Sequence, residues 1–370
     1  LLVYASSWLK LHYPAAFLAG LLRAQPMGFY SASTLVSDAR RHGVEVLRPD
    51  LGLSGADASL ESLVEPVETS TPPTVPEEPR TSTPPTVPEE PREERAGRHE
   101  GPRAGLDSCL DPDQPKIREF DPGAPDESAS HRRDGCFAVR LGLAGVRGIG
   151  PEVATRIVEE RTAHGSYTSM ENLVRRTGVI AEQLEALAAS GALECLGLTR
   201  RQALWRAGSA ALDQPGSLPG TLVEAQPLLF NDPTSTEVLA DDLWATGVST
   251  GDHPIGQLRE ELAGRGVLAT ADLATAPLDR RVEVGGLVTH RQRPATASGI
   301  TFLSLEDEYG LVNVVCSVGV WQRYRRVARS SPALVVRGKL ERSPEGVVNV
   351  VADHLEHLPI MVVHKSRDFH

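Results

Sequence analysis

The stretch LAGVRGIGPEVATRIVEER, from Leu143 to Arg161, decides the fold of the middle of this chain. Gly148 and Gly150 flank one apolar residue, Ile149, and Pro151 follows at a position that suits the first turn of a helix. Glycine adopts backbone conformations that a Cβ atom excludes, so the pattern predicts a tight turn that leads directly into a helix. The apolar side chains at helical spacing behind this turn form the expected inner face of the helix: Val153, Ala154 and Ile157.

This stretch resembles a helix-hairpin-helix motif, in which a Gly–apolar–Gly turn opens a helix. Backbone amides at a helix N-terminus favour an anion, and the glycines let a phosphate approach them. Such contacts grip the backbone of duplex DNA without reading its bases. We therefore predict that the duplex phosphate is bound by Arg147, Gly148, Ile149 and Gly150.

Two other interpretations of the same glycines stay open. In the first, the hairpin is an ordinary structural turn. In the second, it belongs to a DNA glycosylase, which needs a catalytic Lys or Asp after the hairpin, and the sequence offers no convincing candidate.

The rest of residues 135–208 is expected to be helical. Thr168 and Glu171 have the spacing of a capping box, and the run Ala181–Ala189 predicts a helix that stops at Gly191. A basic run then follows, and it is equally consistent with DNA contact and with a solvated helix face: Arg200, Arg201 and Arg206.

Residues 281–360 alternate apolar and polar side chains in the manner of strands, with one helical piece from Val320 to Arg329. Five strands with a helix between the third and the fourth resemble an oligonucleotide-binding (OB-fold) barrel. Such barrels hold single strands with cationic and aromatic side chains, and the candidates here are Arg291, Arg293, Phe302, Trp321, Tyr324, Arg325 and Arg337. The alternative is that Phe302 belongs to the core and that Trp321 and Tyr324 cap the barrel.

Residues 52–134 differ in composition from both regions. The twelve residues TSTPPTVPEEPR occur at Thr69–Arg80 and again at Thr81–Arg92. Proline removes amide donors and the glutamates repel one another, so residues 52–134 are predicted to be a disordered insert. This insert carries 9 basic and 19 acidic residues, which accounts for most of the chain's net charge of −11. Residues 135–210 and 281–370 are mildly basic, which suits a phosphate backbone.

A linker, residues 209–280, contains Gln226-Pro227-Leu228-Leu229-Phe230. This pentapeptide resembles the one with which bacterial polymerases hold the sliding clamp, and the predicted contacts are Gln226, Leu229 and Phe230. The alternative is that Leu229 and Phe230 only tether the linker to a domain.

Several classes of site and location are disfavoured. The four cysteines lie far apart without a CxxC pair, which argues against disulfide frameworks and zinc ribbons and favours the cytoplasm. His354 and His357 lack further metal ligands, and no Walker loop is present. The apolar opening stretch is interrupted by Lys10, His12 and Pro14, so neither a signal peptide nor a membrane span is expected.

The order of these parts resembles the C-terminal portion of bacterial error-prone DNA polymerases of the C family. The stretches that carry the resemblance are YPAAFLAGLL from Tyr13, QPMGFYS from Gln25, ARRHGVEVLRPD from Ala39, AVRLGLAGVRGIG from Ala138 and LEALAASGALECLG from Leu184. The resemblance implies a multidomain α+β chain: the end of the fingers domain in residues 1–51, the helix-hairpin-helix region, the barrel and a tail, 361–370.

The same resemblance implies which steps of DNA synthesis this chain carries out and which belong to the rest of such a polymerase. The three palm aspartates and the Mg²⁺ ions of the family precede the fingers, so no catalytic residue, metal site or cofactor is expected in this chain. Tyr4 falls on a helix that approaches the incoming nucleotide in the family. The implied partners are duplex and single-stranded DNA, the sliding clamp and translesion accessory proteins, with no membrane. The alternative is a stand-alone DNA-binding accessory protein built from the same two modules.

Overall fold

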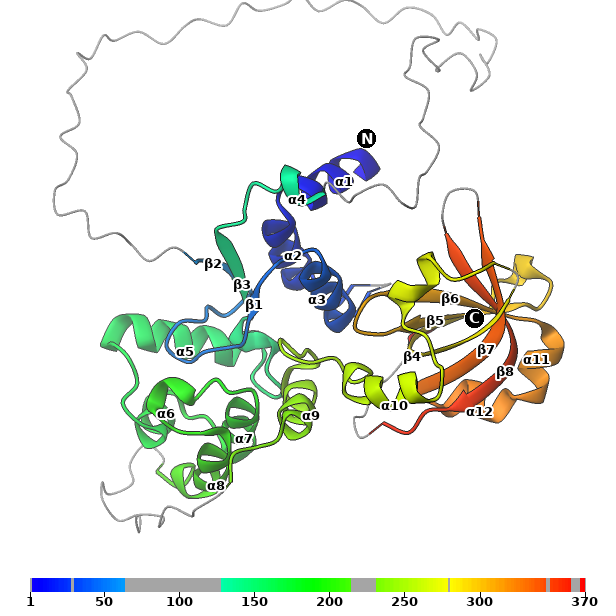
Figure 1. The fold of residues 1–370 in the computed structure, drawn as a ribbon. Coiled ribbons are helices and arrows are strands. Elements are labelled where there is room, and N and C mark those ends of the chain that lie inside the picture. Colours follow the sequence, from blue (N-terminus) through cyan, green and yellow to red (C-terminus); the bar gives the residue numbers. More distant parts are fainter. Residues whose placement is uncertain are drawn as a thin grey trace, which may run out of the picture. The chain divides into compact units, whose positions relative to one another are not determined.

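The computed structural model describes residues 2–27, 30–63, 128–213, 231–278, 280–343, 347–360 and 367–369 (Figure 1). These residues form a helical N-terminal segment with a small sheet, a second helical region and a β-barrel. The predicted multidomain α+β fold is confirmed. Both copies of the twelve-residue repeat and the predicted clamp peptide lie outside the described residues.

The N-terminal segment is helical, as its apolar spacing predicts. Helix α1 spans Leu2–His12, α2 spans Pro14–Arg23 and α3 spans Ala32–Arg41. Pro14 occupies the first turn of α2, and the Ser31 hydroxyl accepts a hydrogen bond from the Thr34 amide at the start of α3. Helices α2 and α3 bury their apolar faces against a small sheet.

That small sheet corrects the predicted boundaries of the insert. Strand β3 (Phe137–Arg140) lies between β1 (Val46–Leu47), which is parallel to it, and β2 (Ser59–Ser62), which is antiparallel. The prediction of disorder is therefore wrong at the two edges, residues 52–63 and 128–134. These edges find partners in the folded part, because β2 pairs with β3 and Asp134 is buried.

The side chain of Asp134 shows what the edge does. Its carboxylate accepts hydrogen bonds from the backbone amides of Ala15, at 2.8 Å, and Ala16, at 3.1 Å. These amides belong to the first turn of α2 and have no partner within the helix. Arg132, just after the short helix α4 (Ser128–His131), forms a salt bridge with the same carboxylate. The segment that follows the insert thus caps helix α2, more than 100 residues earlier in the sequence.

The second helical region begins with the 3-10 turn η2 (Leu143–Gly145) and continues through α5 (Gly150–His164), α6 (Met170–Thr177), α7 (Ala181–Ala189), the 3-10 turn η3 (Glu194–Leu196), α8 (Arg200–Ala210) and α9 (Ser235–Thr246). Its core contains Ile149, Ile157, Leu173, Leu184 and Leu187. The cap of α6 is Ser169, one residue after the predicted Thr168, because the Ser169 hydroxyl accepts from the Asn172 amide.

The helical region is followed by a five-stranded barrel. Its strands are β4 (Arg281–Gln292), β5 (Thr301–Glu306), β6 (Leu311–Cys316), β7 (Ala333–Arg342) and β8 (Val348–His357). They pair in the order β5-β6-β8-β7-β4, and a further pairing between β4 and β5 completes the ring. Strands β6 and β8 are parallel. The inward side chains alternate along the strands and form a separate apolar core.

Helices α11 (Val318–Arg323) and α12 (Arg325–Ser330) lie between the third and fourth strands of the barrel, as predicted. Before the barrel come η4 (Gly256–Leu258), α10 (Arg259–Gly264) and η5 (Thr270–Ala274), and the turn η6 (Ala295–Ala297) lies between β4 and β5. Strand β9 (Arg367–Phe369) pairs in parallel with β4, so part of the predicted tail extends the sheet.

Candidate nucleic-acid interface

The hairpin that opens α5 has the backbone conformation that its glycines predict. Gly148 has a φ of +73° and Gly150 a φ of +61°, which side chains rarely adopt. Ile149 between them is only 2% exposed and packs in the core of the helical region. Arg147 and Gly148 are exposed. The turn therefore fixes an apolar side chain inward while its backbone faces outward.

Two helices of this region begin without a side-chain cap. Helices α6, α8 and α9 are capped by the hydroxyls of Ser169, Thr199 and Thr234. Helices α5 and α7, in contrast, begin after Ile149 and Ile180, and neither receives a hydrogen bond from a side-chain cap. First-turn amides without a cap are the groups that bind an anion at a helix N-terminus.

The two uncapped helix starts are joined by one side chain. The Gln183 amide group donates from Nε2 to the Gly148 carbonyl at 2.9 Å, and its Oε1 accepts from the Ile180 amide at 3.1 Å. Gly178, just before Ile180, is also left-handed. Sequence reasoning placed the phosphate only at the first hairpin. The turn before α7 shares the left-handed glycine and the missing side-chain cap with the first hairpin, and its last residue, Ile180, is 48% exposed.

Arg147 has a partner from outside the hairpin. Its guanidinium lies over the ring of Trp244, 4.9 Å from the ring centroid, and Trp244 is 46% exposed. The backbone amide of Arg147 donates to the carbonyl of Ala245 at 2.7 Å. Helix α9 thus holds the residue that precedes the turn, and Arg147 keeps an exposed cation beside the uncapped start of α5.

The three arginines of α8 that the sequence offered as DNA contacts form salt bridges within the protein. Arg200 is 4% exposed and its Nη1 lies 2.8 Å from a carboxylate oxygen of the buried Asp242. Burial raises the pKa of Asp242, although the Arg200 charge acts in the opposite direction. Arg201 pairs with Glu237 and Arg206 with Glu171. The sequence left two interpretations open for Arg200, DNA contact and a solvated helix face. The structure supports neither, because Arg200 is buried and joins α8 to α9.

Among the barrel candidates, Phe302 lies on the outer side of β5. It is half-buried, it alternates with the buried Thr301 and Leu303, and it does not belong to the apolar core. Its neighbours across the sheet are Gln292 on β4 and Val315 on β6. Single strands bind on this face of OB-fold barrels, across the second and third strands. Arg293, in the loop that leads to β5, is exposed.

The other two aromatic candidates follow the alternative interpretation. Trp321 and Tyr324 pack against the barrel core from α11 and from the α11–α12 junction. The Tyr324 hydroxyl lies 2.8 Å from His354 Nδ1 on β8. Both residues therefore cap the barrel.

The cationic candidates divide in the same way. Arg291 is 7% exposed, which conflicts with the prediction that it binds a single strand. It donates from Nε to the Ala328 carbonyl at 2.7 Å and from Nη2 to the Ser331 carbonyl at 2.6 Å, so it holds the end of α12. Arg337 is exposed but pairs with Asp353 at 3.0 Å. Arg325 is exposed on α12. Sequence reasoning missed three arginines beside it, although the run RYRRVAR displays them: Arg323, Arg326 and Arg329.

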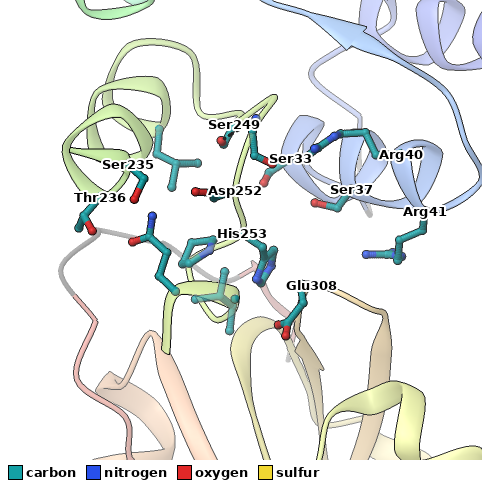
Figure 2. A pocket seen from close by; sticks show the side chains of 16 residues that line it. Ser33, Ser37, Arg40, Arg41, Ser235, Thr236, Ser249, Asp252, His253 and Glu308 are labelled. Atoms are coloured by element: carbon teal, nitrogen blue, oxygen red, sulfur yellow. Dashed lines mark hydrogen bonds between the residues drawn. The ribbon is translucent and has the colours of Figure 1, made fainter. Parts of the chain in front are cut away.

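A pocket of 670 Å³ is lined by α3, by the start of α9 and by the loop around Gly251 (Figure 2). Its lining is polar, with hydroxyls from Ser33, Ser37, Ser235, Thr236 and Ser249. Three of its charged side chains are engaged within the protein: Arg40 donates to the Gly251 carbonyl, Arg41 pairs with Glu306, and Glu308 pairs with Arg259. Asp252 also lines the pocket. The pocket contains none of the predicted interface residues.

Some predicted features are not tested by this geometry. Gln226, Leu229 and Phe230 lie outside the described residues. Within the described ranges, no group of three or more His, Cys, Asp or Glu side chains is placed to hold a metal ion. Among the described helices, none is both long and apolar enough to cross a membrane.

The fold and the exposed groups define a chain with two nucleic-acid-binding modules. A family model described as "Helix-hairpin-helix motif" matches residues 118–203, and one described as "OB-fold nucleic acid binding domain" matches residues 282–358. The chain is only weakly similar in structure to a solved asparaginyl-tRNA synthetase from Pyrococcus horikoshii. The TM-score is 0.22, with 18% identity over 26% of this chain and 23% of that one.

The whole chain is similar to proteins named error-prone DNA polymerase. It is 50% identical to the one from Cutibacterium acnes over 369 residues, which are 100% of this chain and 30% of that protein. It is 40% identical to the one from Mycolicibacterium paratuberculosis over 368 residues, and 42% identical to the one from Nocardia farcinica over 376 residues. These alignments include 100% of this chain, and 27% and 26% of the two relatives. The predicted resemblance is confirmed, and the chain spans about 30% or less of the relatives it matches.

Proposed function

We propose that this chain is the DNA-holding part of an error-prone DNA polymerase that acts in translesion synthesis and DNA repair in the cytoplasm. The observation that carries the proposal is the uncapped start of α5, where the left-handed Gly148 and Gly150 precede the helix beside the exposed Arg147. This site binds a phosphate of duplex DNA, and the outer face of β5 binds a single strand. The relatives named error-prone DNA polymerase support the choice of enzyme.

The two modules divide the substrate of a polymerase between them. Backbone amides at α5 and α7 contact phosphates and carry no base information, which suits an enzyme that moves along any sequence. Phe302 offers a face on which any base stacks, with Arg293 close to the same strand end. Template-directed synthesis itself is assigned to palm aspartates and Mg²⁺ in the remainder of such a polymerase. The sliding clamp, at Gln226, Leu229 and Phe230, and translesion accessory proteins are proposed as protein partners.

The test of duplex binding is the variant Gly150→Ala, with Gly197→Ala as the matched control. Both glycines are left-handed, and a Cβ atom at either one meets no other atom within 4 Å. Both variants therefore introduce similar backbone strain, whereas only the new methyl group at Gly150 stands where a phosphate approaches. A hydrogen bond to a charged group contributes about 1.5–3 kcal/mol, so we expect Gly150→Ala to weaken duplex binding about tenfold or more for all sequences, and Gly197→Ala to leave it unchanged.

The measurement is duplex and single-strand affinity across a salt titration, with circular dichroism to verify folding. Single-strand affinity should be unchanged in Gly150→Ala and should fall in Phe302→Ala, because one stacked base contributes about 1–3 kcal/mol. Equal duplex affinity in folded Gly150→Ala and Gly197→Ala would reduce the hairpin to a structural turn.

A further inference from the structure

Helices α11 and α12 carry four exposed arginines, which we call the arginine track: Arg323, Arg325, Arg326 and Arg329. From Cys316 to Leu340 the sequence contains no Asp or Glu. Within the part of the chain that the structure describes, no salt bridge involves any of the four. A cationic surface of this density, without local carboxylates, attracts a polyanion.

The carboxylates of β8, the strand against which both helices pack, are already engaged. Asp353 pairs with Arg281 at 2.6 Å and with Arg337 at 3.0 Å. Glu356 pairs with Arg265 at 2.8 Å. The positive charge of the arginine track is therefore not neutralised from the neighbouring strand.

The arginine track is held in a fixed position on the barrel. Arg291 binds the last carbonyls of α12, where a cation also complements the helix dipole. Ala328 is fully buried, and Trp321 and Tyr324 pack on the barrel core. A preordered cationic surface loses less conformational entropy when it binds than flexible side chains on a loop do.

The start of α11 lies close to the strands and the loop that carry Phe302 and Arg293. Phe302 pairs with Val315, and the Ser317 hydroxyl then caps α11. A Cβ atom on Gly299 would lie 3.0 Å from Val318 Cγ2 and 3.5 Å from Arg293 Nη2. The loop that carries Arg293 therefore touches the first turn of α11, which is the helix on which the arginine track begins.

We propose that the arginine track binds the phosphate backbone of single-stranded DNA and extends the binding path of the barrel beyond the strand face. The proposal rests on the proposed binding of a single strand at Phe302. It gives the barrel two kinds of contact: bases stack at Phe302, and phosphates further along the same strand contact α11 and α12. The barrel thereby holds a longer piece of strand than its outer strand face alone.

The test compares two double variants that remove the same charge. Arg325→Gln with Arg329→Gln changes the track, and Arg265→Gln with Arg281→Gln removes exposed arginines that already have carboxylate partners. The assay is the affinity of the full chain for oligothymidylates of increasing length across a salt titration. Each lost phosphate contact reduces the salt slope by about 0.7 for single strands, so the track variant should lose about 1.4 units. The control pair should lose much less.

Length gives an independent readout. The track variant should match the unchanged protein on the shortest oligonucleotides that bind, and should fall on the order of tenfold behind on longer ones, which reach α11 and α12. Equal slope changes in the two double variants would overturn the proposal, and so would a loss of affinity for duplex DNA or an acidic peptide instead. If the unchanged chain binds no single strand and Phe302→Ala changes nothing, the proposed function of the barrel fails. If Phe302→Ala weakens binding and the track variant behaves as the control, only the arginine track fails.

Discussion

The hairpin region and the barrel offer nucleic acid different chemical groups. At the hairpin, two helices begin without a side-chain cap, and Ile149 between the two left-handed glycines points inward, so the backbone at the helix start is the proposed phosphate contact. On the barrel, the backbone amides and carbonyls of β5 are hydrogen-bonded to the neighbouring strands. Nucleic acid can therefore contact this face mainly through side chains such as Phe302 and Arg293. The hairpin therefore depends on glycines, and the barrel on the identity of individual exposed residues.

The two regions agree on one point. Each contains an arginine that looks like a DNA contact in the sequence and serves as an internal brace in the structure. Arg200 joins α8 to Asp242 of α9, and Arg291 joins β4 to the end of α12. In both regions a cation is buried to hold in place an element that carries exposed groups: Trp244 on α9 and the arginine track on α12. Variants at these two arginines separate stability from DNA binding.

The largest expected effect is at Arg200. Arg200→Ala leaves Asp242 buried without its partner, and breaking such a pair costs about 3–5 kcal/mol. Arg201→Ala, the next residue, breaks an exposed pair with Glu237 and should cost about 1 kcal/mol or less. Thermal or urea unfolding of both variants measures the difference. Similar losses in both would mean that the Arg200–Asp242 pair is no more important than a surface pair.

The same variant has an expected pH dependence. Burial raises the pKa of Asp242 in the folded chain, so the folded state binds a proton more readily there than the unfolded state does. Such a group contributes stability below its unfolded pKa, and this contribution is lost as pH rises through the folded pKa. Without Arg200 the pKa of Asp242 rises further. The deficit of Arg200→Ala should therefore shrink as pH falls, and a deficit that grows on acidification would contradict this.

The sequence predicts those features of each region that depend on neighbouring residues. Gly148, Ile149 and Gly150 fix the hairpin locally, because the left-handed turn and the inward apolar residue are written in three neighbouring residues. Period-two alternation likewise predicts the barrel strands, and its interruption from Val320 to Arg329 predicts the helical piece between the third and the fourth. These features depend on neighbours in the sequence, so they could be predicted.

Whether an arginine is buried or exposed depends, in contrast, on partners far along the chain. Arg200 meets Asp242, 42 residues away, and Arg291 meets carbonyls near residues 328 and 331. The edge of the insert is a similar case, since Asp134 caps a helix that begins at Pro14. No local pattern distinguishes such side chains from exposed ones. The arginine track, in contrast, has local signs in the sequence: the run RYRRVAR and the absence of acidic residues between Cys316 and Leu340.

The second prediction compares Arg291 with Arg293, two residues along the same chain. Arg291→Met keeps an unbranched apolar side chain but leaves the Ala328 and Ser331 carbonyls without this donor. We expect a loss of about 2–3 kcal/mol in unfolding free energy, since a buried polar group left unsatisfied costs about 1–3 kcal/mol. Arg293→Met, at an exposed position, should change stability by no more than about 0.5 kcal/mol.

Single-strand binding completes this pair of variants. Arg293→Met should weaken single-strand binding while the fold stays intact, because it removes an exposed cation beside Phe302. If Arg293→Met is the less stable of the two variants, the assignment of brace and contact is reversed.

The smallest expected effect concerns Trp244, whose ring supports the Arg147 side chain at the hairpin. Trp244→Ala removes the ring beneath the Arg147 guanidinium but leaves the arginine charge in place. A cation–π contact at an exposed site contributes about 0.5–1 kcal/mol, so duplex affinity should fall about two- to fivefold. Trp205→Ala is the matched control, because Trp205 is 54% exposed on α8 of the same helical region.

The salt slope separates positioning from direct contact at this site. Arg147→Ala removes a phosphate contact and should lower the slope by about 0.9, whereas Trp244→Ala keeps the charge and should leave the slope unchanged. In the double variant the two losses should not add, because Trp244 acts through Arg147. Additive losses would show that the Trp244 ring contacts DNA itself. The hairpin would then resemble the barrel in using an aromatic side chain, and the contrast between backbone and side-chain recognition would no longer separate the two regions.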